Sequence, residues 1–158
     1  MHHLAANYIF DGENFLKNTF ISINDNNLIC AIGKENELSE KPRMIFYNGI
    51  ICPCFLVENE NVFSIEFQKR ILENIKKEYF MYQSDLKSLL KKYTKEIADN
   101  LGINNYGQIK LNINPGLILL ENINLSELKI KDNTSVIELN LSNKIKAFIM
   151  RNQHYFCS

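Results

Sequence analysis

The chain has 158 residues, a length that suits one domain, and its 18 Lys plus Arg balance its 18 Asp plus Glu. This balance argues against a global electrostatic field that would attract nucleic acid or an anionic membrane surface. The sequence has no apolar run of about 18 residues and no basic-then-apolar leader, and its four cysteines form no recognised framework, so it predicts a cytoplasmic protein without a spanning helix.

Short strand-like segments separated by turn residues fill the first third of the chain. Asp11-Gly12 ends the first segment, a loop follows at 34–42, and Asn48-Gly49 is expected to form a tight turn. We expect strands at 4–10, 20–23, 28–33, 44–47 and 50–57. Residues 1–61 are therefore predicted to form an N-terminal β block, in which 20–33 is a hairpin.

The hydrophobic period changes at Ser64, from that of strands to that of helices. Apolar residues from Phe67 to Tyr79 recur at helical spacing, which predicts a helix over 64–79 capped by Ser64. A second leucine-rich stripe predicts a helix that begins with Ser84 as N-cap and ends at Gly102. Residues 62–102 are thus expected to form a helix pair, and the lysines of the second helix are interpreted as a solvated face.

Strand signals return after the second helix and predict a C-terminal β block over 103–140. Its expected strands are 107–110, 117–120 and 136–139, with a turn at 114–116. In the extension 141–158, residues 146–150 are either one more strand or a tail that packs on a partner. The predicted fold class is α+β, a small β-sandwich built from both chain ends with two helices between them, in a single domain 1–158.

Several phrases of the chain resemble, in the same order, segments of the amidohydrolase superfamily. Tyr47-Asn48-Gly49, a hydrophobic strand and then Pro53-Cys54-Phe55-Leu56-Val57 are similar to the passage from the family's sandwich into its first barrel strand. Residues 99–102 look like the end of its final helix, and 114–123 resembles its K-P-G-L-x-L-L-E-N segment. The likeness is to imidazolonepropionase-like enzymes and to chlorohydrolases of the aminofutalosine-deaminase kind. It implies a sandwich built from both chain ends.

The resemblance also implies that the family's metal centre is missing here. The His-x-His positions that hold the metal fall on Asn59 and Asn61, whose neutral amides are weak ligands for zinc or iron. A barrel needs about 200 residues or more, and only a few separate Asn61 from the first helix. The chain reads as an amidohydrolase without barrel strands two to eight, and we expect no metal, no cofactor and no catalytic residue.

Four residues remain as candidates for chemistry. Glu58 and Glu60 would lie on one side of a strand, where two carboxylates can split their pKa values, or they are exposed acids at a strand end. Cys52 and Cys54 form either a Cys-x-Cys metal site or two small buried hydrophobic residues. The three histidines lie near the chain ends and are expected to be inert: His2, His3 and His154.

The function expected from these observations is that of a degenerate amidohydrolase-like pseudoenzyme, a structural or protein-interaction module. Loss of a barrel uncovers apolar surface, so we expect self-association or a protein partner that covers it, and no nucleic acid or membrane partner. One alternative is a subunit of a split metal-dependent amidohydrolase or deaminase, a hydrolase acting on C–N bonds, whose barrel is on another chain. The sequence is also compatible with an enzyme that uses the glutamates or cysteines above, and with a gene product that has no selected role.

Overall fold

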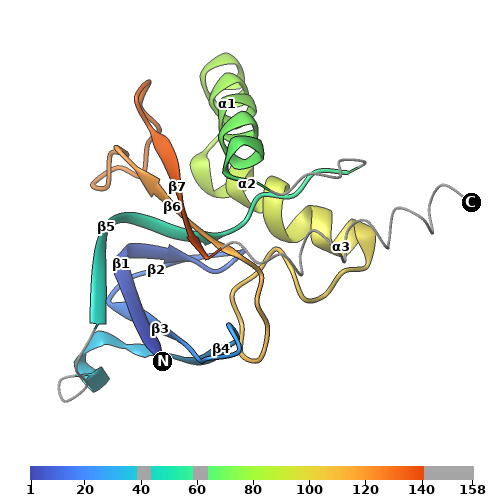
Figure 1. The fold of residues 1–158 in the computed structure, drawn as a ribbon. Coiled ribbons are helices and arrows are strands. Elements are labelled where there is room, and N and C mark those ends of the chain that lie inside the picture. The colour runs from blue at the N-terminus through green and yellow to red at the C-terminus, as the bar shows by residue number, and fades with distance from the viewer. Residues whose placement is uncertain (39–43, 59–63, 141–158) are drawn as a thin grey trace, which may run out of the picture.

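The strands form one bent sheet, and helices inserted between its fifth and sixth strands cover one face (Figure 1). The structure is a computed structural model that describes residues 1–38, 44–58 and 64–140. The strands are β1 (His2–Phe10), β2 (Phe15–Leu16), β3 (Thr19–Ile23), β4 (Ile29–Lys34), β5 (Met44–Pro53), β6 (Leu117–Glu121) and β7 (Ser135–Asn140). The helices are η1 (Glu35–Leu38), α1 (Ile65–Tyr82), α2 (Leu86–Lys91), η2 (Lys92–Glu96) and α3 (Ile97–Leu101).

Two long strands from different parts of the chain hold the sheet together. The strand order is β4-β3-β1-β5-β6-β7, with β2 paired to β1 beside this path. The central pair, β1 with β5, is parallel, and all other pairs are antiparallel. Strands from both chain ends therefore meet in one sheet with helices between them, which confirms the predicted combination of sheet and helices.

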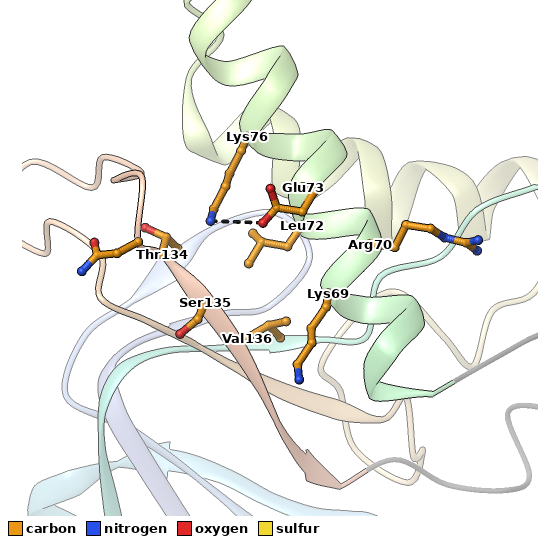
Figure 2. Close-up of a pocket in the computed structure, with 9 residues that line it drawn as sticks. Lys69, Arg70, Leu72, Glu73, Lys76, Thr134, Ser135 and Val136 are labelled. Carbon is orange, nitrogen blue, oxygen red and sulfur yellow. Dashed lines mark hydrogen bonds and ion pairs between the residues drawn. The ribbon is translucent and has the colours of Figure 1, made fainter.

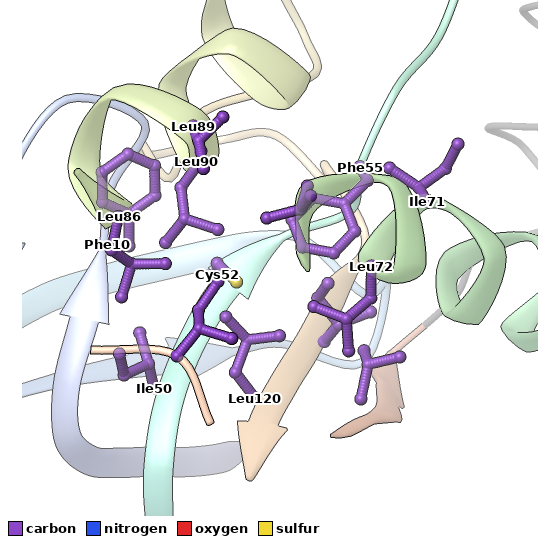
Figure 3. Close-up of a cluster of buried hydrophobic side chains, with 14 of the residues drawn as sticks. Phe10, Ile50, Cys52, Phe55, Ile71, Leu72, Leu86, Leu89, Leu90 and Leu120 are labelled. Atoms are coloured by element: carbon purple, nitrogen blue, oxygen red, sulfur yellow. The ribbon is translucent and has the colours of Figure 1, made fainter. Parts of the chain in front are cut away.

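Both faces of the sheet are buried at the second half of β5, and this explains the continuous apolar run from Ile50 to Pro53. Ile50 and Cys52 face the helices, whereas Ile51 between them faces the opposite side. On the helix side the strands contribute Phe10, Ile50, Cys52 and Leu120, and the helices contribute Ile71, Leu72, Leu86, Leu89 and Leu90 (Figure 3). On the other side the bend of the sheet brings together Ile9, Ile21, Ile29, Ile51 and Leu119. A strand buried on both faces shows no alternation of polar and apolar residues.

Asn48-Gly49 does not form the predicted turn, because β5 runs continuously from Met44 to Pro53. The register between β1 and β5 shifts here, and the Asn7 side chain accepts a hydrogen bond of 2.7 Å from the Gly49 N–H. Gly49 has φ +152°, and a Cβ there would lie 2.2 Å from the Leu120 carbonyl oxygen. The Asn-Gly pair thus marks an irregularity within a strand, where only glycine fits.

The predicted helix pair is confirmed, with changes at its boundaries. Ser64 caps α1 as predicted, and its hydroxyl accepts a hydrogen bond of 3.2 Å from the Phe67 N–H. The helix continues to Tyr82, past the predicted end, and stops at Gln83 in the left-handed region. The prediction of Ser84 as the second cap is wrong, because the Asp85 carboxylate accepts the hydrogen bond from the Ser88 N–H.

The second helix is continuous from α2 through η2 to α3, but η2 is a π-helical turn. At its centre the buried Thr94 hydroxyl donates to the Leu90 carbonyl at 2.7 Å. Gly102, in the left-handed region at φ +69°, ends the helix as predicted. The π turn has no counterpart in the hydrophobic pattern, which is that of an ordinary helix.

The C-terminal strands are confirmed in part. The predicted strands 117–120 and 136–139 correspond to β6 and β7. The predicted strand at 107–110 is wrong, because this segment is irregular and its Ile109 N–H donates to the Asp11 carbonyl at 2.9 Å. The predicted loop after β4 begins with the short helix η1. Residues 146–150 lie outside the described ranges.

Candidate functional site

The segment 53–57 leaves the sheet at Pro53 and forms hydrogen bonds with both helices. It is not a strand, so the predicted strand 50–57 is too long. The Phe55 N–H donates to the Gln68 side-chain oxygen at 2.7 Å, and the Gln68 amide donates back to the Phe55 carbonyl at 3.1 Å. The Leu56 N–H donates to the Tyr93 carbonyl in the π turn at 2.7 Å. One residue of each helix, Gln68 and Tyr93, thus provides the main-chain hydrogen bonds that a neighbouring strand would otherwise provide.

Gln68 is the residue that closes this segment. Its side chain is completely buried, and so is Phe55. A carboxamide offers one acceptor and an N–H₂ donor, as a peptide unit of an adjacent strand offers an acceptor and a donor. The Gln68 side chain therefore satisfies both main-chain groups of Phe55. Sequence analysis did not single out Gln68, because this residue occurs within an ordinary helical pattern.

Cys52 and Cys54, the candidate Cys-x-Cys pair, are both fully buried in the cluster beneath the helices. Burial raises the pKa of both thiols, and for Cys54 the nearby Cys52 and Glu138 add to the rise. The thiolate is the form that binds metal or attacks a substrate, so this environment favours the interpretation of both residues as small hydrophobic side chains. Within the described ranges, no three His, Cys, Asp or Glu residues are grouped so that they could hold a metal ion.

The other predicted residues do not come together in one place. Glu58 is exposed, and Asn59, Glu60 and Asn61 lie outside the described ranges, as does His154. His2 is exposed at the start of β1. His3 is buried, with its Nδ1 2.6 Å from the Ser22 hydroxyl, so the second histidine belongs to the sheet core.

A pocket of about 430 Å³ lies between α1 and β7 (Figure 2). We call it the α1–β7 groove, and it is lined by Lys69, Arg70, Leu72, Glu73, Lys76, Asn133, Thr134, Ser135 and Val136. Leu72 and Val136, both buried, form its apolar floor. Lys69 and Lys76 extend from α1 towards β7, whereas Arg70 points away from that strand (Figure 2). Sequence analysis missed this groove because its two walls are more than 50 residues apart in the chain.

Electrostatics in the α1–β7 groove are dominated by the two lysines. The Lys76 ammonium lies 3.3 Å from a Glu73 carboxylate oxygen and 3.0 Å from the Asp132 carbonyl oxygen. An ammonium has three N–H donors, so one donor of Lys76 remains for a ligand. Among the described residues, no acid forms an ion pair with Lys69. The groove thus combines an apolar floor with a positive wall.

A second surface lies at the start of β5. Met44, Ile45 and Phe46 are large apolar residues with 38%, 45% and 53% of their surfaces exposed. One edge of this part of β5 pairs with β1, but β6 pairs only with Ile50 to Pro53. No described strand occupies the other edge of 44–47, so its main-chain groups and apolar side chains are presented together.

Comparison with known proteins does not relate this chain to a family. No protein-family model matches the chain, and no curated protein matches it. In the ranges that the structure describes, none of the helices has the length and apolar character needed to cross a bilayer.

Proposed function

We propose that this protein is a non-catalytic interaction module that self-associates through the start of β5. The observation that carries the proposal is the exposure of Met44, Ile45 and Phe46 on a strand edge with which no strand of the described ranges pairs. Consecutive residues of a strand point to opposite faces, so apolar side chains are presented on both sides of this edge. An edge with free main-chain groups and apolar side chains is a template for pairing with another chain.

A second copy of the chain is the partner that this edge fits. Two identical strand segments that pair in antiparallel fashion are related by a two-fold axis, so the contact is self-complementary and closes at a dimer. Pairing of residues 44–47 with their copies would satisfy main-chain groups on both chains and would shield Ile45 and Phe46 from water. No other chain is needed for this arrangement.

We interpret the bent sheet as the sandwich of an amidohydrolase from which the barrel has been lost. Strands from both chain ends share the apolar cluster formed by Ile21, Ile51 and Leu119 on the inner side of the bend, which supports this interpretation. Each strand of a barrel pairs with a neighbouring strand on both sides. Here the N–H and C=O of Phe55 are both hydrogen-bonded to the Gln68 side chain, so they are not available to a neighbouring strand. This closure favours an interaction module over a subunit of a split metal-dependent hydrolase, the alternative function.

Sedimentation equilibrium of the wild type, Phe46→Lys and the control Leu111→Lys would test the proposal. Leu111 is also apolar and 51% exposed, but it lies outside the sheet. We expect the wild type and Leu111→Lys to be dimers and Phe46→Lys to be a folded monomer, since the substitution brings two lysines, one from each chain, close together in the contact, where they repel. A monomeric wild type, or a dimer that Phe46→Lys leaves intact, would refute it. Co-purification with a metal-bound barrel protein would favour the split hydrolase.

A further inference from the structure

From the α1–β7 groove we infer a second binding site, one that takes an extended acidic segment of a partner protein as an added strand on β7. This site is separate from the self-association surface, because no residue that lines the groove belongs to β5, and the start of β5 lies away from α1 (Figure 1). Three features of the groove carry the inference: a strand edge that pairs with no strand of the described residues, an apolar floor and a positive wall.

The strand edge comes from the position of β7 at the end of the sheet. β7 pairs with β6 through Ser135 to Asn140, and no described strand pairs with its other edge. Main-chain N–H and C=O groups along a free edge can pair with an extended peptide, whose alternate side chains then enter pockets beside the strand. Ile137, 39% exposed, and Glu138 show that the middle of this strand is accessible.

The helix α1 supplies a wall along the same edge. It packs against β7, and its pocket-lining residues Lys69, Leu72, Glu73 and Lys76 recur every three or four positions, so they lie along one side of the helix. A strand added to β7 would have this side of α1 above it and Val136 beside it. Apolar side chains of the added strand would contact Leu72 and Val136, which form the floor.

Charge determines which segment fits. Lys76 follows Lys69 by seven positions, which is about 10 Å along a helix and about three residues of an extended peptide. An extended segment that lies along this side of the helix can therefore place one acidic side chain near each of the two lysine positions. Glu73 lies between the two lysines and pairs with Lys76, and no acid of the described residues forms an ion pair with Lys69.

The test uses fluorescence anisotropy with the full chain and a labelled peptide of alternating Glu and Val residues. Two control peptides replace every Glu by Lys, or carry N-methyl groups on alternate residues that block strand pairing. We expect the acidic peptide to bind, and both controls to bind at least about tenfold more weakly, because they remove the charge match or the main-chain hydrogen bonds. Binding should also weaken as salt is raised, because Lys69 is exposed and its charge is screened by salt.

A pair of charge reversals on α1 locates the site. Lys69→Glu should weaken binding of the acidic peptide about tenfold, whereas Lys77→Glu, an exposed lysine of the same helix outside the groove, should change it less than about twofold. No binding of the acidic peptide, equal effects of the two variants, or equal binding of the N-methylated peptide would overturn the inference. Displacement of the peptide by inorganic phosphate at equal concentration would also overturn it, in favour of a simple anion site. Sedimentation of the same variants should remain that of the wild type, which separates this result from the fate of the β5 dimer.

Discussion

Replacing Gln68 by alanine should be among the most destabilising single changes in this protein. The substitution removes both hydrogen bonds to Phe55 while its N–H and C=O stay buried. An unsatisfied buried group costs about 1–3 kcal/mol, so the loss should be about 2–6 kcal/mol. A domain of this size has a free energy of unfolding of about 5–15 kcal/mol, and each kcal/mol lowers the melting temperature by roughly 2–4 °C. The expected loss is therefore a large part of the total free energy of unfolding.

Urea unfolding, followed by circular dichroism, measures this loss directly. The chain has no tryptophan, so tyrosine fluorescence provides the second probe. The matched control is Asn74→Ala, which removes an exposed carboxamide from the same helix and should change stability by less than about 0.7 kcal/mol, because alanine favours helix. A loss below about 1 kcal/mol for Gln68→Ala would refute the view that this side chain closes the segment after β5.

Gln68→Glu gives the same site a pH dependence whose sign can be worked out. Burial raises the pKa of a carboxyl group above its unfolded value of about 4.3. The protonated acid can still donate to the Phe55 carbonyl, so stability is retained at low pH and is lost as pH rises through the raised pKa. The difference in unfolding free energy from the wild type should therefore grow between about pH 4 and pH 8. A constant difference would contradict this account.

Two further changes test the sheet and the helix pair. Gly49→Ala should lower the free energy of unfolding by about 2–4 kcal/mol, because the new Cβ would clash with the Leu120 carbonyl oxygen. Gly102 also has a positive φ but has open space around it, so Gly102→Ala should lower it by only about 1 kcal/mol. Equal melting temperatures would contradict this order. The Tyr93 hydroxyl donates to Glu78 at 2.5 Å, and with Lys92 it lowers the pKa of Glu78, although burial alone would raise it. Stability from a lowered pKa is present above about pH 4.3 and is lost in acid, so Tyr93→Phe should cost about 1 kcal/mol at pH 7 and less below pH 4. Unfolding curves at pH 3 and pH 7 measure the difference, and the same cost at both would count against it.

The sequence predicted those elements whose signals are local. The Ser64 cap with the apolar stripe after it, Gly102 as the helix end, and the apolar run at 117–120 each depend on neighbours within a few residues. Such signals act on the backbone directly, through capping, left-handed geometry and period, so they needed no knowledge of the tertiary structure.

The features that the sequence did not predict depend on partners far along the chain. Asn48-Gly49 has the composition of a turn, but β1 pairs on both sides of it and keeps the strand continuous. The backbone of Phe55 is satisfied by Gln68, which is 13 positions away, and the α1–β7 groove exists only because α1 packs on a strand that follows much later. Of the residues predicted as candidates for chemistry, both cysteines are buried as the hydrophobic interpretation expected, although Cys54 lies past the end of β5 and not in the predicted strand. The role of the groove lysines had no local signal.

The pairing of Pro53 with Leu117 has a consequence for how this protein can change in length. The chain leaves the sheet at Pro53 and returns at Leu117. The segment between them, which contains the helices, is therefore an insertion whose two ends lie side by side. Each doubling of the length of such an insertion adds only about 0.6 kcal/mol to the entropic free-energy cost of bringing its ends together. The sheet can therefore accept a much longer or a shorter insertion at this junction without any change in its own strand order.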